Sequence, residues 1–269
     1  MNILITGGTD GIGLALAKKF LNLNYKVFIV GRSFKKGYRI VQKLGNPNLN
    51  FLQCDLSEKK EIKELIKQLN KLSHLDILIN NAGAIFDKRV ETSEGIEKTF
   101  ALNHLSYFHL SLGLQNQLEK SNIAKIINIS SNAHKRYSLN INDLESEINY
   151  NGWKAYCRSK LLNIYLTYLY KEKLRTKINC NCIHPGFVNS NFGNNNRSLY
   201  RFLVELLKKI LAISPEKASL SAYNLSLDDK YKKINGKYFY KLKEKKSSPE
   251  SYNKKIAEII WNKSLVYIK

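Results

Sequence analysis

Tyr156 and Lys160 stand four residues apart in a stretch with helical periodicity, so their side chains lie on one face of a helix. An isolated phenol, with a pKa of about 10, is a poor acid or base at neutral pH. A neighbouring ammonium group stabilises the phenolate and lowers this pKa, which suits the pair for proton transfer to or from an alcohol oxygen. Because the chain contains 16 tyrosines, an exposed Tyr–Lys pair is the alternative interpretation, and the surrounding motifs must decide.

A glycine-rich turn near the start of the chain predicts a phosphate-binding loop. Residues 6–13 read TGGTDGIG, between an apolar run and a helical pattern. Backbone N–H groups and the helix dipole at such a turn can meet a pyrophosphate, although glycines also mark simple tight turns. The cofactor contacts expected from this loop are Gly7, Thr9, Asp10, Gly11, Ile12 and Gly13.

The end of the second expected strand distinguishes NAD from NADP. An acidic residue here binds the ribose 2′-hydroxyl of NAD, whereas an arginine suits the 2′-phosphate of NADP. This chain has Arg32 and Ser33 at that place and no acid anywhere in residues 11–54. A guanidinium can bind a phosphate through two parallel hydrogen bonds, so NADP(H) is favoured over NAD(H). Lys35 and Lys36 are either further phosphate contacts or part of a solvated helix face.

Several motifs in a fixed order resemble the short-chain dehydrogenase/reductase family. They are the T-G-x-x-x-G-x-G loop, Asp55-Leu56 after the third expected strand, Asn80-Asn81-Ala82-Gly83 after the fourth, and Tyr156-x-x-x-Lys160. The resemblance covers essentially the whole chain. It implies further cofactor contacts from Asp55, Leu56, Asn81, Ala82 and Gly83. The glycine loop departs from many NADP-preferring relatives because it lacks their basic residue.

The same resemblance implies a catalytic tetrad. Ser131, at the end of the buried run Ile126–Ser131, would hold and polarise the substrate oxygen. Tyr156 would be the acid/base, and Lys160 would bind the nicotinamide ribose and tune Tyr156. Asn103 would help to fix a proton-relay water.

A proline–glycine turn after the sixth expected strand resembles the family's turn over the nicotinamide. Pro185 and Gly186 form this turn. The backbone near Val188 and the hydroxyl of Ser190 would hold the carboxamide and a phosphate. Ser190 stands where a threonine is commoner, and it keeps the hydroxyl group.

Three features resemble the retinol-dehydrogenase-like branch of the family. The spacing between Ser131 and Tyr156 is longer than in most members, and the chain contains Asn103-His104-Leu105 and a late Ile234–Phe239 motif. This resemblance implies a small-molecule alcohol or carbonyl substrate, and the strongly apolar segment Ser198–Ile213 suggests that this substrate is lipophilic. The N-terminal membrane anchor of several animal members is not expected here, because no signal or anchor pattern opens the sequence.

The elements that must position these residues alternate between short β-rich runs and helical patterns, which is typical of a doubly wound sheet. We expect one domain with an α/β Rossmann-type parallel sheet of about seven strands and helices on both faces. Residues 1–130 would mainly bind the dinucleotide, and residues 131–269 would supply catalysis and substrate binding. The expected strands lie near residues 2–6, 26–31, 49–53, 75–80, 124–130, 178–183 and 237–240. The expected helices lie near residues 11–22, 34–44, 58–71, 94–119, 154–174, 198–212, 215–227 and 249–266.

Serine and proline mark two of the expected helix starts. Ser214-Pro215-Glu216 and Ser248-Pro249-Glu250 each offer a hydroxyl cap, a first-turn proline and an acid at the positive end of the helix dipole.

Composition excludes several classes of protein. The 269 residues include no apolar run of 18 or more, so no membrane-spanning helix is expected, and four cysteines in a chain of this size fit a reducing cytoplasm. The net charge of +22 concentrates in residues 14–54 and 230–269. Scattered lysines without a base-stacking motif do not indicate specific nucleic-acid binding.

Three further patterns each leave two interpretations. Cys180, Cys182 and His184 alternate as metal ligands could, but a buried strand before a turn is favoured, and no metal is expected. Ser198–Ile213 is either a wall of a lipophilic pocket with weak peripheral membrane contact or a helix that covers the core. Lys154–Lys173 is apolar on two sides, so its second side is covered either by loops or by a homodimer partner.

At the level of function, a non-catalytic dinucleotide sensor or partner-binding protein on the same fold is the alternative to an enzyme.

Overall fold

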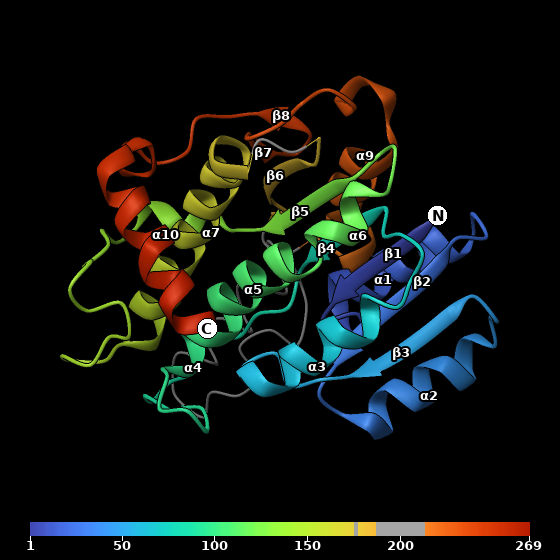
Figure 1. The fold of residues 1–269 in the computed structure, drawn as a ribbon, viewed down its shortest axis with the longest axis horizontal. Coiled ribbons are helices and arrows are strands. Elements are labelled where there is room, and N and C mark those ends of the chain that lie inside the picture. Colours follow the sequence, from blue (N-terminus) through green and yellow to red (C-terminus); the bar gives the residue numbers. More distant parts are fainter. Residues whose placement is uncertain (175–176, 187–212) are drawn as a thin grey trace.

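A single sheet organises the computed structural model, which describes residues 1–174, 177–186 and 213–269 (Figure 1). Its eight strands in the described residues are β1 (Asn2–Thr6), β2 (Lys26–Gly31), β3 (Leu49–Gln53), β4 (Ile77–Asn80), β5 (Lys125–Ile129), β6 (Asn179–His184), β7 (Tyr238–Tyr240) and β8 (Lys243–Glu244). They lie in the order β3-β2-β1-β4-β5-β6-β7-β8. All neighbouring pairs are parallel except β7 and β8.

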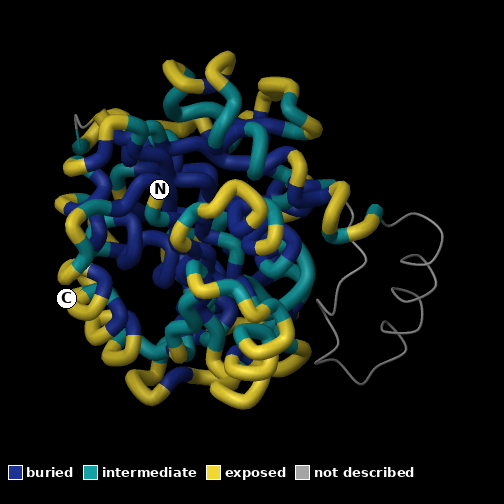
Figure 2. Tube along the Cα trace, turned by 90° about the vertical axis from the view of Figure 1, so that its right-hand side faces the viewer, coloured by how far each residue is buried: buried dark blue, intermediate teal, exposed yellow. Residues whose placement is uncertain are grey.

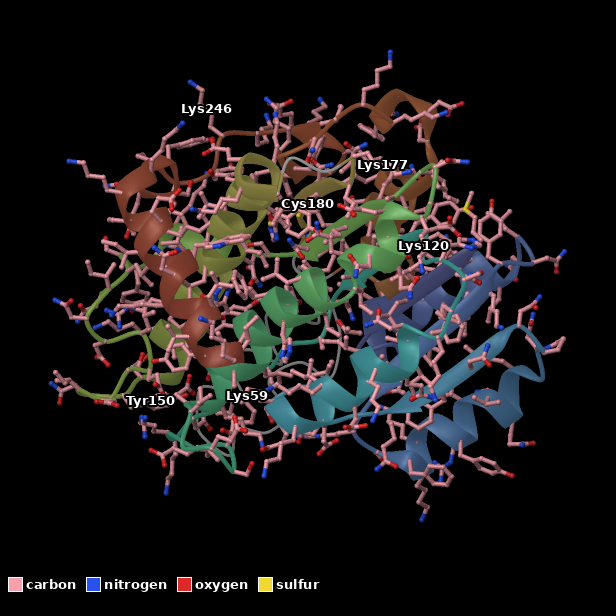
Figure 3. The ribbon with its side chains drawn as sticks, viewed as in Figure 1. Lys59, Lys120, Tyr150, Lys177, Cys180 and Lys246 are labelled. Carbon is pink, nitrogen blue, oxygen red and sulfur yellow. The ribbon has the colours of Figure 1, made fainter. Side chains whose placement is uncertain are left out.

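The central strands are apolar on both faces because helices cover both sides of the sheet. In β1, Ile3 and Ile5 face one layer and Leu4 faces the other, and all three are completely buried. Buried residues fill the interior and exposed residues follow the outer turns (Figure 2). Cys180 lies inside the fold, whereas Lys246 projects from the surface (Figure 3).

Three helices pack on the Ile3 and Ile5 face, namely α1 (Gly11–Leu21), α2 (Phe34–Leu44) and α9 (Pro215–Leu227). The opposite face carries α3 (Lys59–Leu69), α5 (Ser106–Gly113) and α7 (Gly152–Leu174). Outside α7 lies α10 (Lys254–Ile268), so helix α7 is covered by the chain's own C-terminal part. This arrangement confirms the predicted α/β Rossmann-type sheet with helices on both faces.

The sheet has one strand more than the sequence predicted. Strand β8 contains only Lys243 and Glu244, which are exposed and show no apolar alternation. It forms because Lys241 and Leu242 adopt left-handed backbone conformations, with φ of 47° and 63°, and fold the chain back on β7. A two-residue edge strand of this kind carries no sequence pattern.

The helix predicted near residues 94–119 is present from residue 98 on, but it is not one regular helix. It consists of α4 (Lys98–Phe100), a π-helical turn (Ala101–Leu105), α5 and α6 (Gln115–Glu119). Both carboxylate oxygens of Glu97 accept backbone N–H groups of the first turn, which fixes where the helical stretch begins. The extra residue of a π turn changes which side chains face the site, and π turns are frequent at functional positions.

The two Ser-Pro-Glu signals behave differently. The Ser214 hydroxyl accepts the N–H of Lys217 and caps α9, as predicted. The predicted cap at Ser248 is wrong, because its hydroxyl oxygen finds no hydrogen-bond partner among the described residues. Residues Pro249–Tyr252 form a 3-10 turn, and α10 begins only after Asn253, whose side chain accepts the N–H of Ile256.

The helix expected near residues 198–212, most of the apolar segment Ser198–Ile213, and the cofactor contacts Val188 and Ser190 lie outside the described residues. Across the part of the chain that the structure describes, no helix has both the length and the hydropathy needed to cross a bilayer. Within the same part, no group of three His, Cys, Asp or Glu side chains is arranged to hold a metal ion.

Helix α7 begins in close contact with the segment after β4. A Cβ atom on Gly152 would lie 2.0 Å from the carbonyl oxygen of Phe86. We therefore expect Gly152→Ala to lower the free energy of unfolding by about 1–3 kcal/mol, because the backbone must move apart. Urea unfolding measures the change. Lys154→Ala, in the same first turn, is the control, and a Gly152→Ala variant as stable as this control would contradict the contact.

Candidate active site

The glycine loop is fastened to the end of β4. The Thr6 hydroxyl accepts the backbone N–H groups of Asn81 at 2.8 Å and Ala82 at 3.0 Å, and the Asn81 amide donates to the Thr6 carbonyl at 2.8 Å. Two of the predicted motifs, 75 residues apart, thus form one unit. A Cβ on Gly7 would lie 3.0 Å from the Ala82 Cα, and one on Gly13 would lie 2.3 Å from the Gly7 carbonyl oxygen. Only glycines allow this close approach.

The start of α1 has the geometry of an anion site. Gly7 and Gly11 have left-handed φ values of 65° and 49°, which turn the backbone from β1 into the helix. Asp10 caps α1 by accepting the N–H of Gly11 at 2.7 Å, and Ile12 is partly buried in the first turn. Thr9 lies close to Gly31, because a Cβ atom added to Gly31 would lie 3.0 Å from the methyl group of Thr9. Such a loop at a helix N-terminus suits the pyrophosphate of a dinucleotide.

The end of β2 presents Arg32 and Ser33 at the surface. The Ser33 hydroxyl accepts the N–H of Lys36 and caps α2. The sequence makes Lys35 and Lys36 candidates for further phosphate contacts. The Lys36 ammonium lies 2.7 Å from the Asp10 carboxylate, so Lys36 forms an ion pair with the glycine loop. Arg32 is exposed at the end of β2, where the sequence predicts the contact with a 2′-phosphate.

Asp55 and Leu56 follow β3 on the same edge of the sheet. Asp55 accepts both the hydroxyl, at 2.6 Å, and the N–H, at 3.0 Å, of Ser57. Partial burial raises the pKa of Asp55, but these hydrogen bonds, with Lys98 and Arg32, outweigh burial and hold the pKa below its usual value. Asp55 is therefore an ionised acceptor.

Tyr156 and Lys160 lie on α7, and both are buried. The Lys160 ammonium donates to the carbonyl oxygen of Ile129 at 3.1 Å and lies 5.6 Å from the centroid of the Tyr156 ring. It also lies 5.5 Å from the Tyr107 ring. Burial lowers the pKa of Lys160 to about 8. A cation so close to a phenol favours the phenolate form.

Ser131 begins the turn that follows β5. Its hydroxyl accepts the N–H of Ala133 at 3.2 Å and begins the 3-10 turn Asn132–Lys135. Ala133 packs in one apolar cluster with Tyr156 and Ile85. The 3-10 turn that Ser131 begins therefore packs against the Tyr156 end of α7.

Asn103 is completely buried in the π-helical turn. Its side chain accepts the N–H of Ala84 at 2.9 Å and donates to the Ala84 carbonyl and the Ser159 hydroxyl. Its own carbonyl accepts the Asn163 amide at 2.8 Å. A Cβ on Gly83 would lie 3.3 Å from the Asn103 amide oxygen and 3.4 Å from the Lys160 nitrogen, so the two side chains converge where the chain has only glycine.

The turn after β6 contains Pro185, which is buried, and Gly186, with a φ of 102°. The Gly186 N–H donates to the His184 ring, which stacks on Tyr240 with centroids 5.0 Å apart. Cys182 is buried in β6, as the favoured strand interpretation requires.

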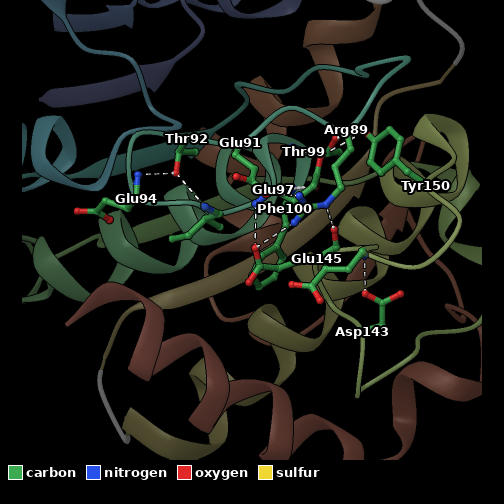
Figure 4. A network of polar contacts seen from close by, with 12 residues as sticks. Arg89, Glu91, Thr92, Glu94, Glu97, Thr99, Phe100, Asp143, Glu145 and Tyr150 are labelled. Atoms are coloured by element: carbon green, nitrogen blue, oxygen red, sulfur yellow. Dashed lines mark hydrogen bonds and ion pairs between the residues drawn. The ribbon is translucent and has the colours of Figure 1, made fainter.

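Sequence reasoning missed the network that holds the long segment between Ser131 and Tyr156 (Figure 4). Glu97 accepts the Tyr150 hydroxyl at 3.2 Å, and the Glu145 carboxylate accepts the Glu97 N–H at 2.9 Å. Burial raises the pKa of Glu97 despite the hydrogen bonds from Thr99 and Phe100. The Arg89 guanidinium donates to the Glu145 carbonyl oxygen. The unusual length of the segment was the available signal, but it does not reveal these partners.

A Rossmann-type sheet with a glycine loop after β1 and a buried Tyr–Lys pair on the helix before β6 is the arrangement of a nucleotide-binding oxidoreductase. Residues 1–200 match the short chain dehydrogenase family. The chain belongs to this family, which confirms the predicted resemblance.

Curated relatives identify the branch. Human polyprenol dehydrogenase is 32% identical over 97% of this chain and 83% of its own length. Human retinol dehydrogenase 12 is 32% identical over 97% of this chain and 84% of its own length. These relatives confirm the predicted resemblance to the retinol-dehydrogenase-like branch and support an oxidoreductase that acts on CH–OH groups.

Solved structures show the same fold. An uncharacterized protein from Mycobacterium paratuberculosis superposes with a TM-score of 0.81 at 20% identity, over 99% of this chain and 92% of that chain. Pseudomonas aeruginosa RhlG, in an NADP active-site complex, superposes with a TM-score of 0.69 at 24% identity, over 93% of this chain and 96% of that chain.

The buried ammonium of Lys160 makes a pH-dependent contribution to stability. Below pH 8 the lysine is protonated in both states, and the folded state bears the whole desolvation penalty. Between pH 8 and about 10 the folded protein releases this proton before the unfolded chain does, so the wild type gains stability as pH rises. We expect its unfolding free energy to rise relative to that of Lys160→Met between about pH 7 and pH 9.5 in urea titrations. A constant difference would contradict the lowered pKa.

Proposed function

We propose that the protein is an NADP(H)-dependent oxidoreductase that transfers a hydride between the nicotinamide and an alcohol or carbonyl carbon of a lipophilic substrate. The observation that carries this proposal is the buried Tyr156–Lys160 pair beside the turn that Ser131 begins. Residues 1–130 would mainly hold the dinucleotide, and residues 131–269 would supply the catalytic and substrate-binding groups.

The residues present fit a dinucleotide. Gly7 and Gly11 turn the backbone to offer N–H groups at the start of α1, and Gly83 leaves space between Asn103 and Lys160 that a side chain would fill. Asp55, an ionised acceptor, lies at the same edge of the sheet. When bound, the cofactor would supply or accept the hydride.

Proton transfer is the task of the chain's own side chains. In the reducing direction Tyr156 would give its phenolic proton to the carbonyl oxygen as negative charge develops there. The Ser131 hydroxyl already accepts from Ala133, so its own hydrogen can be donated to the same oxygen and stabilise that charge. The Lys160 ammonium would stabilise the phenolate that remains and hold the nicotinamide ribose. Asn103 would fix the relay water that returns a proton to Tyr156.

The preference for NADP rests on charge at the end of β2. Arg32 is exposed there, while Lys36 neutralises the carboxylate of Asp10 in the glycine loop. A 2′-phosphate would therefore meet a guanidinium without an opposing unpaired acid from Asp10. Because cells keep NADP mostly reduced, we expect carbonyl reduction to be the direction of the reaction.

Two observations support a lipophilic substrate. Trp153 stacks on Tyr156 with ring centroids 5.6 Å apart, and Ile85 and Ala133 pack around the same tyrosine, so the surroundings of the phenol are apolar. The relatives are named for polyprenol and retinol, which are lipophilic alcohols. A cytoplasmic location, a membrane contact of residues 198–213 and a homodimer stay predictions.

Tyr156→Phe tests the acid/base assignment. We expect NADPH-dependent reduction of a panel of long-chain aldehydes and ketones to fall by roughly a hundredfold or more, because the phenolic proton is lost. NADPH binding, followed by fluorescence titration, should remain. Tyr137→Phe, an exposed tyrosine in the preceding segment, is the control. Full turnover by Tyr156→Phe would remove the assigned acid, and NADPH binding without turnover by the wild type would favour the non-catalytic alternative.

Arg32→Ala tests the cofactor preference. Loss of a charge-assisted contact to the 2′-phosphate is expected to raise KM for NADPH by roughly tenfold to a hundredfold and to leave KM for NADH within about twofold. Steady-state kinetics with both cofactors measure the two values. Arg39→Ala serves as the control, because Arg39 is also exposed but lies on α2 and not at the end of β2. An equal rise in KM for NADPH and for NADH would show that Arg32 does not distinguish the 2′-phosphate from the 2′-hydroxyl.

A further inference from the structure

His134 folds back onto Ser131 from the same 3-10 turn. Its ring nitrogen Nδ1 lies 2.7 Å from the Ser131 carbonyl oxygen, and its backbone N–H donates to that oxygen at 3.2 Å. The ring is buried, with 1% of the residue exposed, and it makes a T-shaped contact with the Tyr238 ring at a centroid distance of 5.1 Å. His134 therefore makes two contacts to the backbone of Ser131 from a fixed orientation.

The other ring nitrogen defines the protonation state. The backbone N–H of Ser248 lies 3.0 Å from Nε2 of His134. Because a backbone N–H can only donate, Nε2 must be the unprotonated nitrogen, and the single proton of the neutral ring is on Nδ1. Nδ1 thus donates to the Ser131 carbonyl. Burial lowers the pKa of His134 to about 4, although the hydrogen bond to Ser131 acts in the opposite direction, so the neutral ring agrees with the geometry.

The partner of Nε2 belongs to a segment anchored on the helix that carries Tyr156. The segment between β8 and α10 passes along α7 (Figure 1). The Tyr168 and Ser247 hydroxyls lie 2.7 Å apart, and the Tyr165 hydroxyl donates to the Glu250 carbonyl at 2.6 Å. The Ser251 hydroxyl donates to the Ser248 carbonyl at 2.6 Å. The Ser248 N–H therefore occupies a position fixed relative to α7.

We infer that His134 is a positioning residue that sets the place of the Ser131 hydroxyl relative to Tyr156, through a hydrogen-bond bridge from Ser131 to Ser248. The last residue of the β5 ladder is Ile129, so the ladder itself does not hold the Ser131 carbonyl. The His134 ring holds the Ser131 carbonyl and links it to residues 247–252, which are themselves hydrogen-bonded to α7, the helix that carries Tyr156. The inference rests on the proposed function, in which Ser131 contacts the substrate oxygen.

Two amide substitutions separate the two halves of the bridge. In H134N the amide nitrogen of the shorter side chain can take the place of Nδ1 and keep the bond to Ser131, while the bond to Ser248 is lost. In H134Q the longer amide reaches the place of Nε2, where its oxygen can accept from Ser248, but the bond to Ser131 is lost. Because either substitution breaks the bridge between Ser131 and Ser248, we expect both H134Q and H134N to lower kcat by about tenfold to a hundredfold with little change in KM for NADPH. An H134N enzyme that kept the wild-type kcat would show that the bond to Ser248 plays no part in positioning Ser131.

A double-mutant cycle with Ser131→Ala separates positioning from general stability. If His134 acts through the Ser131 hydroxyl, H134Q has no further effect on kcat in the Ser131→Ala background. Thermal unfolding of each variant is measured in parallel. A kcat that follows the unfolding temperature in both backgrounds, or an H134Q enzyme as fast as wild type, would overturn the positioning role. Wild-type protein that reduces no member of the carbonyl panel would instead overturn the proposed function and the inference with it.

The wild-type protein provides a readout that needs no substitution. In ¹⁵N-labelled protein at about pH 7, the imidazole spectrum of His134 should show a neutral ring protonated at Nδ1. A ring protonated at Nε2 would overturn the bridge, whatever the kinetics of the variants.

Discussion

The interaction on which the site depends is the burial of the Lys160 ammonium. A cation removed from water must be compensated by nearby polar groups, and here the carbonyl oxygen of Ile129 and the faces of Tyr107 and Tyr156 surround it. These contacts tie the end of β5 to α7. They also keep a positive charge close to the Tyr156 ring, and a nearby cation favours the phenolate form of a tyrosine.

The space next to the Lys160 ammonium is open because the neighbouring backbone, at Gly83, carries no side chain. Gly83 leaves open the region where Asn103 and Lys160 converge, and the π-helical turn directs Asn103 toward Ala84. The Thr6 hydroxyl joins the same loop to the glycine turn. The predicted cofactor loop and Asn103 are thus parts of one hydrogen-bonded framework at the carboxyl edge of the sheet, where ligands bind in folds of this kind.

The C-terminal part completes the framework. Residues 247–252 and α10 cover α7 and contact the long segment after Ser131, since Glu250 accepts the Leu139 N–H and Tyr267 donates to Glu145. This part of the same chain packs on α7, whose second side the sequence left open to loops or to a dimer partner, and the homodimer stays a prediction. Among the basic residues near the glycine loop, Lys36 forms an ion pair with Asp10. The net charge of the segment therefore did not indicate which of its basic residues could bind a phosphate.

The sequence by itself was enough to locate seven of the strands, the glycine loop and the four predicted catalytic positions. Each of these is marked by a local pattern, namely an apolar run, a group of glycines or the spacing of a motif. It could not predict β8, because this two-residue edge strand follows a tight turn and has no apolar alternation. It could not predict the contacts of Asn103 in the π-helical turn or the failure of Ser248 to cap, because both residues have partners that are distant in the chain. The bond between His134 and Ser248 joins residues 114 apart. Only the tertiary structure decides such contacts, since a hydrogen bond between distant residues leaves no periodicity in the sequence, and burial excludes the water that would otherwise take its place.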